Sequence, residues 1–160
     1  EVGVVEVRGP NVFKGYWRMP EKTAEEMRED GFFITGDVAS QSDDGYVTIV
    51  GRAKDLIITG GLNVYPKEVE QAVDALPGVI ESAVFGVPHP DFGEAVVAAV
   101  TASGPVGDVA AALRDHLAGY KLPKHVAVVD ELPRNSMGKV QKALLREQFS
   151  GLFVGVTEET

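Results

Sequence analysis

Cysteine is absent from the 160 residues of the sequence. Without cysteine the chain can form neither a disulfide framework nor a thiolate metal site, which excludes many small secreted and zinc-binding domains. Long apolar runs are absent as well, although a membrane-spanning helix needs about 20 consecutive apolar residues. We find no signal-peptide pattern at the start of the chain. These absences predict a cytoplasmic protein with no membrane partner.

Positive charge is also scarce, because the chain has 15 Lys and Arg residues but 24 Asp and Glu residues, giving a net charge of −9. An acidic chain without a basic stripe is poorly suited to nucleic acid, and we expect no such partner. No histidine has a second ligand at metal-binding spacing, so we predict no metal site in the chain. The composition, 44% hydrophobic and 24% charged, is typical of a globular protein.

The first third of the chain predicts a β-rich segment with one short helix. Runs rich in β-branched and aromatic residues predict strands at 4–9, 32–39 and 46–51. A proline at its first turn and a glycine after its last turn predict a helix between Pro20 and Gly31. These elements are too few to close a core. We therefore interpret residues 1–53 as an incomplete, β-rich part of a larger domain, and we expect a longer protein.

After Gly51 the sequence predicts a compact α+β domain. Helices are predicted at 66–76, 106–119 and 140–149, and strands at 55–59, 79–87, 95–101 and 126–129. Asp108 is the predicted N-cap of the second helix. Up to the last strand, the order strand-helix-strand-strand-helix-strand is that of a split βαβ unit. We therefore expect a small domain with a three-stranded sheet and flanking helices at residues 54–150, followed by a tail at 151–160.

Two short motifs contain residue types that suit ligand binding. "TGD" places Asp37 at the end of a strand-like run, where a carboxylate can accept the hydroxyl protons of a ribose. A turn is the alternative, because aspartate is common in turns. Gly60 and Gly61 follow another short strand, and glycine lets the backbone approach a ligand with no Cβ in the way. A hairpin turn is the alternative for this pair.

The segment "LPRNSMGKVQK" places Lys139 after a glycine on an exposed turn. Lysine is a mobile point charge that suits a phosphate or a carboxylate. The alternative is a solvated lysine at the start of the next helix, where a positive charge is slightly unfavourable to the helix dipole. Because helix stability does not explain the lysine, we favour a functional role for it.

Taken in this order, the segments resemble the adenylate-forming family, which includes acyl-CoA synthetases, peptide-synthetase adenylation domains and luciferases. The resemblance runs from Glu1 to Phe149. Within the family, malonyl-CoA synthetases are the most similar subgroup in the segments "GGLNVYPKEVE", "GVPHPDFGEAV" and "LPRNSMGKVQK". It implies that residues 1–53 end a large N-terminal AMP-binding domain. It also implies that residues 54–150 are the small C-terminal lid domain.

The resemblance implies a two-step ligase reaction that uses ATP, Mg²⁺ and CoA. A carboxylate first attacks the α-phosphate of ATP, giving an acyl-adenylate and pyrophosphate, and Lys139 would bridge the two reacting groups. The lid domain then rotates, and the thiol of CoA attacks the acyl carbon. The family's phosphate loop, adenine platform, Mg²⁺ ligand and acyl pocket lie upstream of the matching segments. We therefore expect the chain alone to be inactive.

The resemblance also implies roles for residues near the domain boundary. Asp37 would hold the ribose hydroxyls of the nucleotide, and Arg52 would lie near the same ribose. Lys54 takes the hinge position, where many relatives have aspartate. Gly60 and Gly61 would line the passage of the pantetheine arm of CoA.

The expected substrate is a small carboxylic acid, with malonate or another small dicarboxylate favoured. A fatty-acid or aryl-acid CoA ligase is the nearest alternative, and the acyl pocket that would decide lies outside the chain. A hypothesis from a different class is an isolated lid domain that acts as an interaction module. In that hypothesis a protein lysine acetyltransferase is the partner, and it recognises Lys139.

Overall fold

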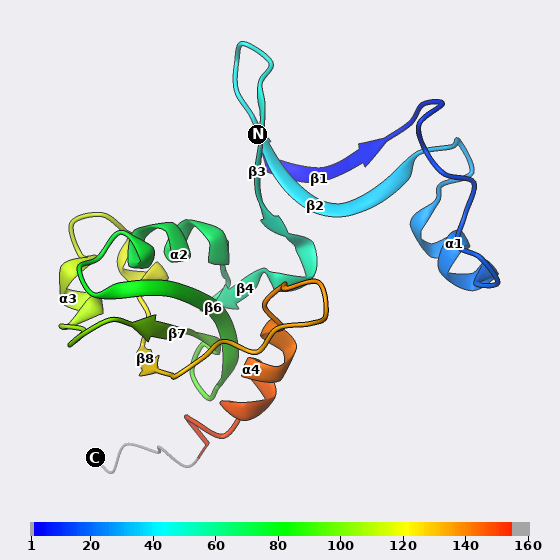
Figure 1. Cartoon of the computed structure of the whole chain (residues 1–160). Helices are drawn as coiled ribbons and strands as arrows, with labels where there is room; N and C mark the ends of the chain where they lie inside the picture. Colours follow the sequence, from blue (N-terminus) through cyan, green and yellow to red (C-terminus); the bar gives the residue numbers. More distant parts are fainter. Residues whose placement is uncertain (1, 155–160) are drawn as a thin grey trace. The chain divides into compact units, whose positions relative to one another are not determined.

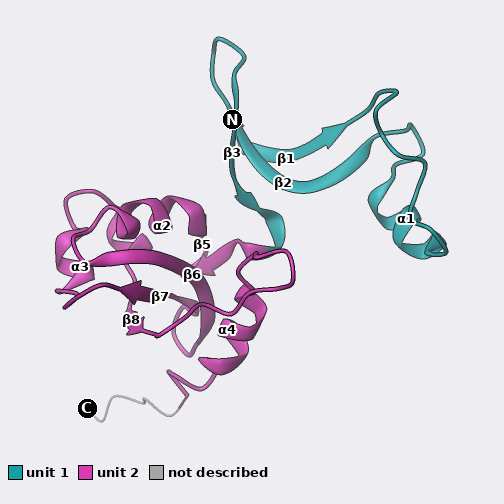
Figure 2. Ribbon diagram, in the orientation of Figure 1, with its two compact units in different colours: residues 1–54 teal, residues 55–160 magenta. Residues whose placement is uncertain are grey.

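The computed structural model describes residues 2–154, which divide into two compact units (Figures 1 and 2). The first unit ends at Lys54 and the second begins at Asp55. Helices and strands occur in both units, and the predicted α+β fold class is confirmed. The interpretation of residues 1–53 as the end of an AMP-binding domain stays a prediction. The predicted tail lies outside the described residues from position 155 onward.

The first unit is built on a three-stranded antiparallel sheet in the order β1-β2-β3. The strands are β1 (Val2–Val7), β2 (Phe33–Gln41) and β3 (Val47–Arg52), and the helix is α1 (Pro20–Glu26). The helix begins at Pro20, as predicted, but it ends before Gly31. It ends early because Met27 adopts an extended conformation and pairs with Phe33 as an isolated antiparallel bridge.

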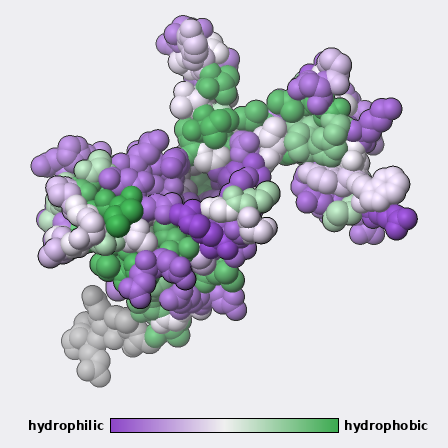
Figure 3. All heavy atoms as spheres, in the orientation of Figure 1, coloured by the Kyte–Doolittle hydropathy of each residue, from purple (hydrophilic) through white to green (hydrophobic). Residues whose placement is uncertain are grey.

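Few side chains of the first unit are buried. Among residues 2–54 only Val38 and Ala39 are buried. Large apolar side chains on the outer strands are instead exposed, namely Val2, Val4, Val7, Val47 and Ile49. Figure 3 shows apolar surface over this part of the chain. Burial of apolar area is the main favourable term in folding, so the first unit has little stabilisation of its own.

The sheet of the second unit contains five strands. They are β4 (Ile57–Thr59), β5 (Leu62–Val64), β6 (Val79–His89), β7 (Gly93–Ala102) and β8 (His125–Val128). β6 and β7 form a long antiparallel pair, β8 lies parallel to β7, and these make the three-stranded part of the sheet. β4 and β5 form a short hairpin that joins at Gly93 and extends the sheet beyond the predicted three strands.

Three α-helices cover this sheet, namely α2 (Pro66–Asp74), α3 (Val109–Ala112) and α4 (Lys142–Gln148). Asp108 caps α3, as predicted, by accepting a hydrogen bond from the amide of Ala111. The helix is much shorter than predicted, because the amides of Arg114 and His116 bond three residues back and tighten the chain into turns. No helix in residues 2–154 has the length and apolar character needed to cross a membrane.

The core of the second unit lies on both faces of the β6–β7 pair. Side chains of α2 and α3 pack on one face with Val84, and α4 packs on the other face with Phe85 (Figure 1). Leu145 is the buried residue of α4, whereas its neighbour Leu144 is 47% exposed. The position of α4 therefore depends on this buried leucine, on the partly buried Val140 and Phe149 that flank the helix, and on the polar contacts of its ends.

We predict that Leu145→Ala lowers the free energy of unfolding of the second unit by about 2–5 kcal/mol, because the change leaves a cavity in a packed core. Leu144→Ala is the matched control on the same helix and should change stability by less than about 0.5 kcal/mol, as for exposed sites. Urea unfolding of the chain measures both. Equal effects of the two substitutions would contradict the packing of α4 described above.

Candidate functional site

Lys139 lies at the end of a tight turn between β8 and α4. The amide of Asn135 donates to the carbonyl of Lys139 at 2.9 Å, and the amide of Gly138 donates to the carbonyl of Asn135 at 2.9 Å. The side-chain oxygen of Asn135 accepts from the amides of Met137 and Lys139 at 3.0 and 2.9 Å. Gly138 has a φ of +77°, which favours glycine. The backbone of Lys139 is therefore fixed by the turn itself.

The stem of this turn is attached to the sheet. Arg134 and Val140 form an antiparallel bridge across the stem, and Leu132 is buried at its start. The guanidinium of Arg134 donates to the carbonyl of Gly138 at 2.7 Å and forms an ion pair with Glu81 on β6. These contacts join the turn to the long strand pair of the core.

The side chain of Lys139 is exposed at the surface of the second unit. Within residues 2–154 its ammonium group forms no ion pair with an acidic side chain. A fixed backbone thus presents an exposed positive charge that takes no part in an ion pair within the described residues. This arrangement suits the predicted contact with a phosphate or a carboxylate.

The structure brings together Asp37 and Arg52, the two residues predicted to bind a ribose. They are directly paired across β2 and β3, and a guanidinium nitrogen of Arg52 lies 2.6 Å from a carboxylate oxygen of Asp37. The same nitrogen donates to the carbonyl of Thr35 at 3.2 Å. "TGD" lies within β2, so the alternative of a simple turn does not describe it.

A pocket of about 430 Å³ lies in the first unit, and Arg52 is one of its lining residues. Tyr16, Lys22 and Glu26 also line this pocket. The hydrogen bond from the Tyr16 hydroxyl to the carboxylate of Glu26 raises the pKa of the phenol above its ordinary value. This pair could not be recognised from the sequence, because Tyr16 stands in a loop without periodicity and its partner is on α1.

Lys54 lies in a short 3₁₀ turn, Ala53–Asp55, and its side chain is exposed. The two compact units meet in sequence at this residue. Asp55, which follows it, forms an ion pair with Arg146 of α4 at 3.3 Å. The backbone is therefore anchored immediately after Lys54, and the hinge role of this lysine stays a prediction.

Gly60 and Gly61 form the two-residue loop of the β4–β5 hairpin. Their φ values are +57° and +78°, the pattern of a type I′ turn, which favours glycine at both central positions. The amide of Gly60 also donates to the carbonyl of Phe92 at 2.8 Å. The hairpin alternative noted from the sequence therefore accounts for both glycines, and their CoA role stays a prediction.

The predicted site residues are divided between the two units. The first unit contains Asp37, Arg52 and Lys54, and the second contains Gly60, Gly61 and Lys139. In the described part of the chain no three His, Cys, Asp or Glu side chains lie together as a possible metal site.

Comparison with known proteins finds a family match within the second unit. Residues 68–139 match the family described as the AMP-binding enzyme C-terminal domain. The match confirms the resemblance to adenylate-forming enzymes that the motifs indicated, and it includes the turn that ends at Lys139.

Both the structural and the curated relatives of the chain are longer than the chain itself. The ATP-bound crystal structure of MatB from Rhodopseudomonas palustris is 57% identical with a TM-score of 0.89, and the match covers 96% of this chain and 31% of that one. A feruloyl-CoA synthase from an Amycolatopsis species is 50% identical over 153 residues, 93% of this chain and 31% of that protein. A long-chain-fatty-acid–CoA ligase from Yersinia pestis is 43% identical over 149 residues, 91% of this chain and 26% of that protein. The chain spans about a third or less of the length of these relatives.

We predict that Gly61→Ala destabilises the second unit by about 1–2 kcal/mol, because a Cβ disfavours the left-handed backbone that the turn requires. Gly104→Ala is the matched control, since Gly104 has no such backbone angle and no atom within 4 Å of a new Cβ. Its stability should be unchanged or slightly raised. Chemical denaturation of the chain measures both variants. A loss as large at Gly104 would show that the turn conformation is not the cause.

Proposed function

We propose that the chain is the C-terminal part of an ATP-dependent acid–CoA ligase of the cytoplasm. The observation that carries this proposal is the exposed ammonium of Lys139, which forms no ion pair within residues 2–154 and extends from a fixed turn in the segment that matches the AMP-binding enzyme C-terminal domain. Two similar proteins are named as CoA synthases or ligases, which supports the same reaction class for the longer protein.

Lys139 acts in the first step of the proposed reaction. As the acid's carboxylate attacks the α-phosphate of ATP, negative charge increases on the phosphate oxygens and pyrophosphate leaves. A cation held near those oxygens lowers the barrier if its contact is stronger in the transition state than in the ground state. The turn from Asn135 to Lys139 fixes the backbone from which the ammonium extends, so little reorganisation is needed.

Asp37 and Arg52 bind the ribose of the nucleotide in this proposal. A carboxylate has acceptor positions on two oxygens, so one oxygen that pairs with Arg52 leaves other positions for hydroxyl protons. The 2.6 Å contact with Arg52 also orients the carboxylate before the nucleotide binds. The pair therefore provides a preformed acceptor for the ribose hydroxyls.

The second step requires the lid domain to rotate about Lys54. The thiol of CoA attacks the acyl carbon, the bond to the phosphate oxygen breaks, and AMP leaves. Gly60 and Gly61 line the route of the pantetheine arm, since neither has a side chain that would narrow it. Withdrawal of Lys139 accompanies this rotation.

Malonate or another small dicarboxylate is the proposed acid. The motifs that resemble malonyl-CoA synthetases support this choice, whereas the feruloyl-CoA and long-chain relatives keep aryl and fatty acids as alternatives. A screen of the full-length protein for acid-dependent pyrophosphate release tests these classes. It should compare malonate, short monocarboxylates, ferulate and a long-chain fatty acid, and malonate should give the fastest release.

Exposure of Lys139 also meets the requirement of the second candidate function, recognition by a protein lysine acetyltransferase. Acetylation removes the charge of a lysine. In an acid–CoA ligase the acetylated protein should lose the first step, whereas a pure interaction module would show no pyrophosphate release before or after acetylation. The same screen therefore separates the two candidates.

We predict that Lys139→Ala slows adenylate formation by about 10²–10³-fold, as expected for the loss of a group that stabilises transition-state charge. A pre-formed acyl-adenylate should still react with CoA at nearly the wild-type rate. Met137→Ala is the control, because Met137 is 72% exposed in the same turn and carries no charge. If adenylation of Lys139→Ala falls by less than about tenfold, or 1.4 kcal/mol, the lysine is not catalytic.

We predict that Lys54→Pro spares adenylate formation and slows thioester formation by more than about tenfold, because proline fixes the φ angle of a residue that must rotate. Lys54→Ala is the control, since it removes the side chain and leaves the backbone free. The two half-reactions are measured separately in the full-length protein. An equal loss of both in Lys54→Pro would mean that the pivot lies elsewhere.

A further inference from the structure

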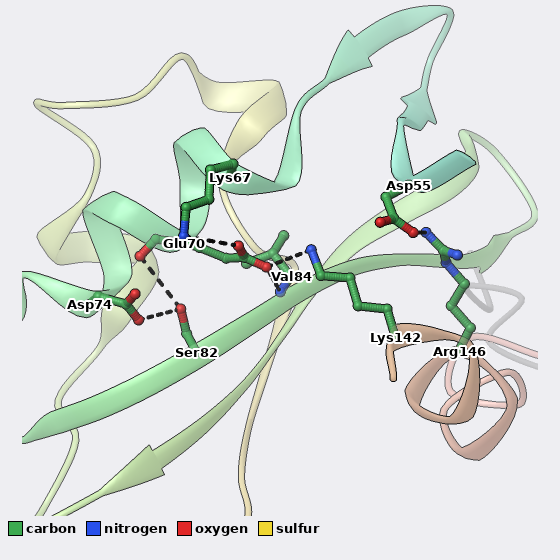
Figure 4. Close-up of polar contacts among 8 residues, drawn as sticks. All are labelled: Asp55, Lys67, Glu70, Asp74, Ser82, Val84, Lys142 and Arg146. Carbon is green, nitrogen blue, oxygen red and sulfur yellow. Dashed lines mark hydrogen bonds and ion pairs between the residues drawn. The ribbon is translucent and has the colours of Figure 1, made fainter. Parts of the chain in front are cut away.

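Glu70 is a buried acidic residue in α2, with its side chain only 9% exposed. Burial of a charged carboxylate is costly unless it is paired and hydrogen-bonded. One oxygen accepts from the amide of Val84 on β6 at 3.0 Å and lies 2.6 Å from the ammonium of Lys142 (Figure 4). Its other oxygen lies 3.9 Å from the ammonium of Lys67. Glu70 therefore joins α2, β6 and the start of α4.

Lys142 is the partner that connects Glu70 to the Lys139 turn. It is the first residue of α4, and its side chain is only 18% exposed. A positive charge at the start of a helix is unfavourable to the helix dipole. The pairing with Glu70 explains why a lysine stands there. Its ammonium is directed to a carboxylate in the interior rather than to the surface where Lys139 is exposed.

The other end of α4 has an ion pair of its own. Arg146 in its last turn contacts Asp55, the residue that follows Lys54 (Figure 4). The helix is thus fixed at its start to α2 and β6, and at its end to the beginning of the second unit. The segment that carries Lys139 and the segment after Lys54 are attached to the same short helix.

We propose that Glu70 and Lys142 are positioning residues for Lys139, an inference that rests on the proposed ligase function. The turn fixes the backbone of Lys139 only relative to its own stem. Leu132 and the Arg134–Glu81 pair attach the first strand of that stem to the core. The second strand is attached by the partly buried Val140 and by the Lys142–Glu70 pair. A displacement of about 1 Å at a reacting group can cost about 10²-fold in rate. Loss of the buried pair therefore slows the step in which Lys139 acts.

The test measures both half-reactions in the full-length protein. Lys142→Met removes the charge and keeps the length of the side chain. It should slow acid-dependent pyrophosphate release at least about tenfold, with thioester formation from a pre-formed acyl-adenylate changed less than about twofold. Lys142→Arg retains the pair and should restore most of the first rate.

Glu70→Gln separates positioning from direct catalysis by Lys142. If Lys142 itself contacted the phosphate, loss of Glu70 would release its ammonium and leave adenylation intact or faster. Positioning predicts the same loss as in Lys142→Met. It also predicts a double variant no slower than the single ones, because both changes remove one interaction.

Lys121→Met is the matched control. Lys121 lies in the 3₁₀ turn Gly119–Lys121 and pairs at 2.6 Å with Glu68, which is also on α2, but within residues 2–154 its ammonium forms no ion pair with the Lys139 stem. Both half-reactions should be unchanged. Melting temperatures of all variants accompany the rates.

The outcomes distinguish this inference from the function on which it rests. Equal loss of both half-reactions in Lys142→Met, with a lowered melting temperature, would show a purely structural pair and overturn the inference. So would an unchanged adenylation rate while Lys139→Ala is impaired. If the wild-type protein releases no pyrophosphate with any acid, the ligase proposal fails and the inference fails with it.

Discussion

The antiparallel pairing of β6 with β7 is the constraint on which the second unit depends. The two strands are paired from Val79 and Ala102 to His89 and Gly93, and side chains pack on both of their faces. Backbone hydrogen bonds and burial thus act on the same residues. The glycine hairpin joins this pair at Gly93, and the stem of the Lys139 turn joins it through Glu81. Each predicted site of this unit is therefore a loop attached to one rigid hairpin.

Much of this framework could be predicted from the sequence because it depends on local patterns. Two long apolar runs gave β6 and β7, a helical period after Pro66 gave α2, and Asp108 gave the start of α3. The predicted end of α3 was wrong. The residues after Ala112 continue a helical pattern in the sequence, but their backbone hydrogen bonds form tight turns. The short strand β5 was not predicted, because three residues are too few to show the alternating pattern of a strand.

The polar contacts that support the site could not be predicted, because they join residues far apart in the chain. Arg134 and Glu81 are separated by 53 positions, and Arg146 and Asp55 by 91. Nothing in either local sequence indicates its partner. By contrast, Asp37 and Arg52 were placed near one ribose by resemblance to a family, and the strand register brings them into contact. Motifs thus indicate the side chains for which we propose a function, whereas the fold determines which contacts hold them in place.

The turn before α4 keeps its shape without using the charge of Lys139. Its shape depends on backbone hydrogen bonds and on the side chains of Asn135 and Arg134. Within the described residues, no hydrogen bond or ion pair of the turn uses the ammonium of Lys139. The fold of the turn therefore does not depend on the charge at this position. A reversible chemical modification of that nitrogen would remove or restore the charge while the shape of the turn stays the same.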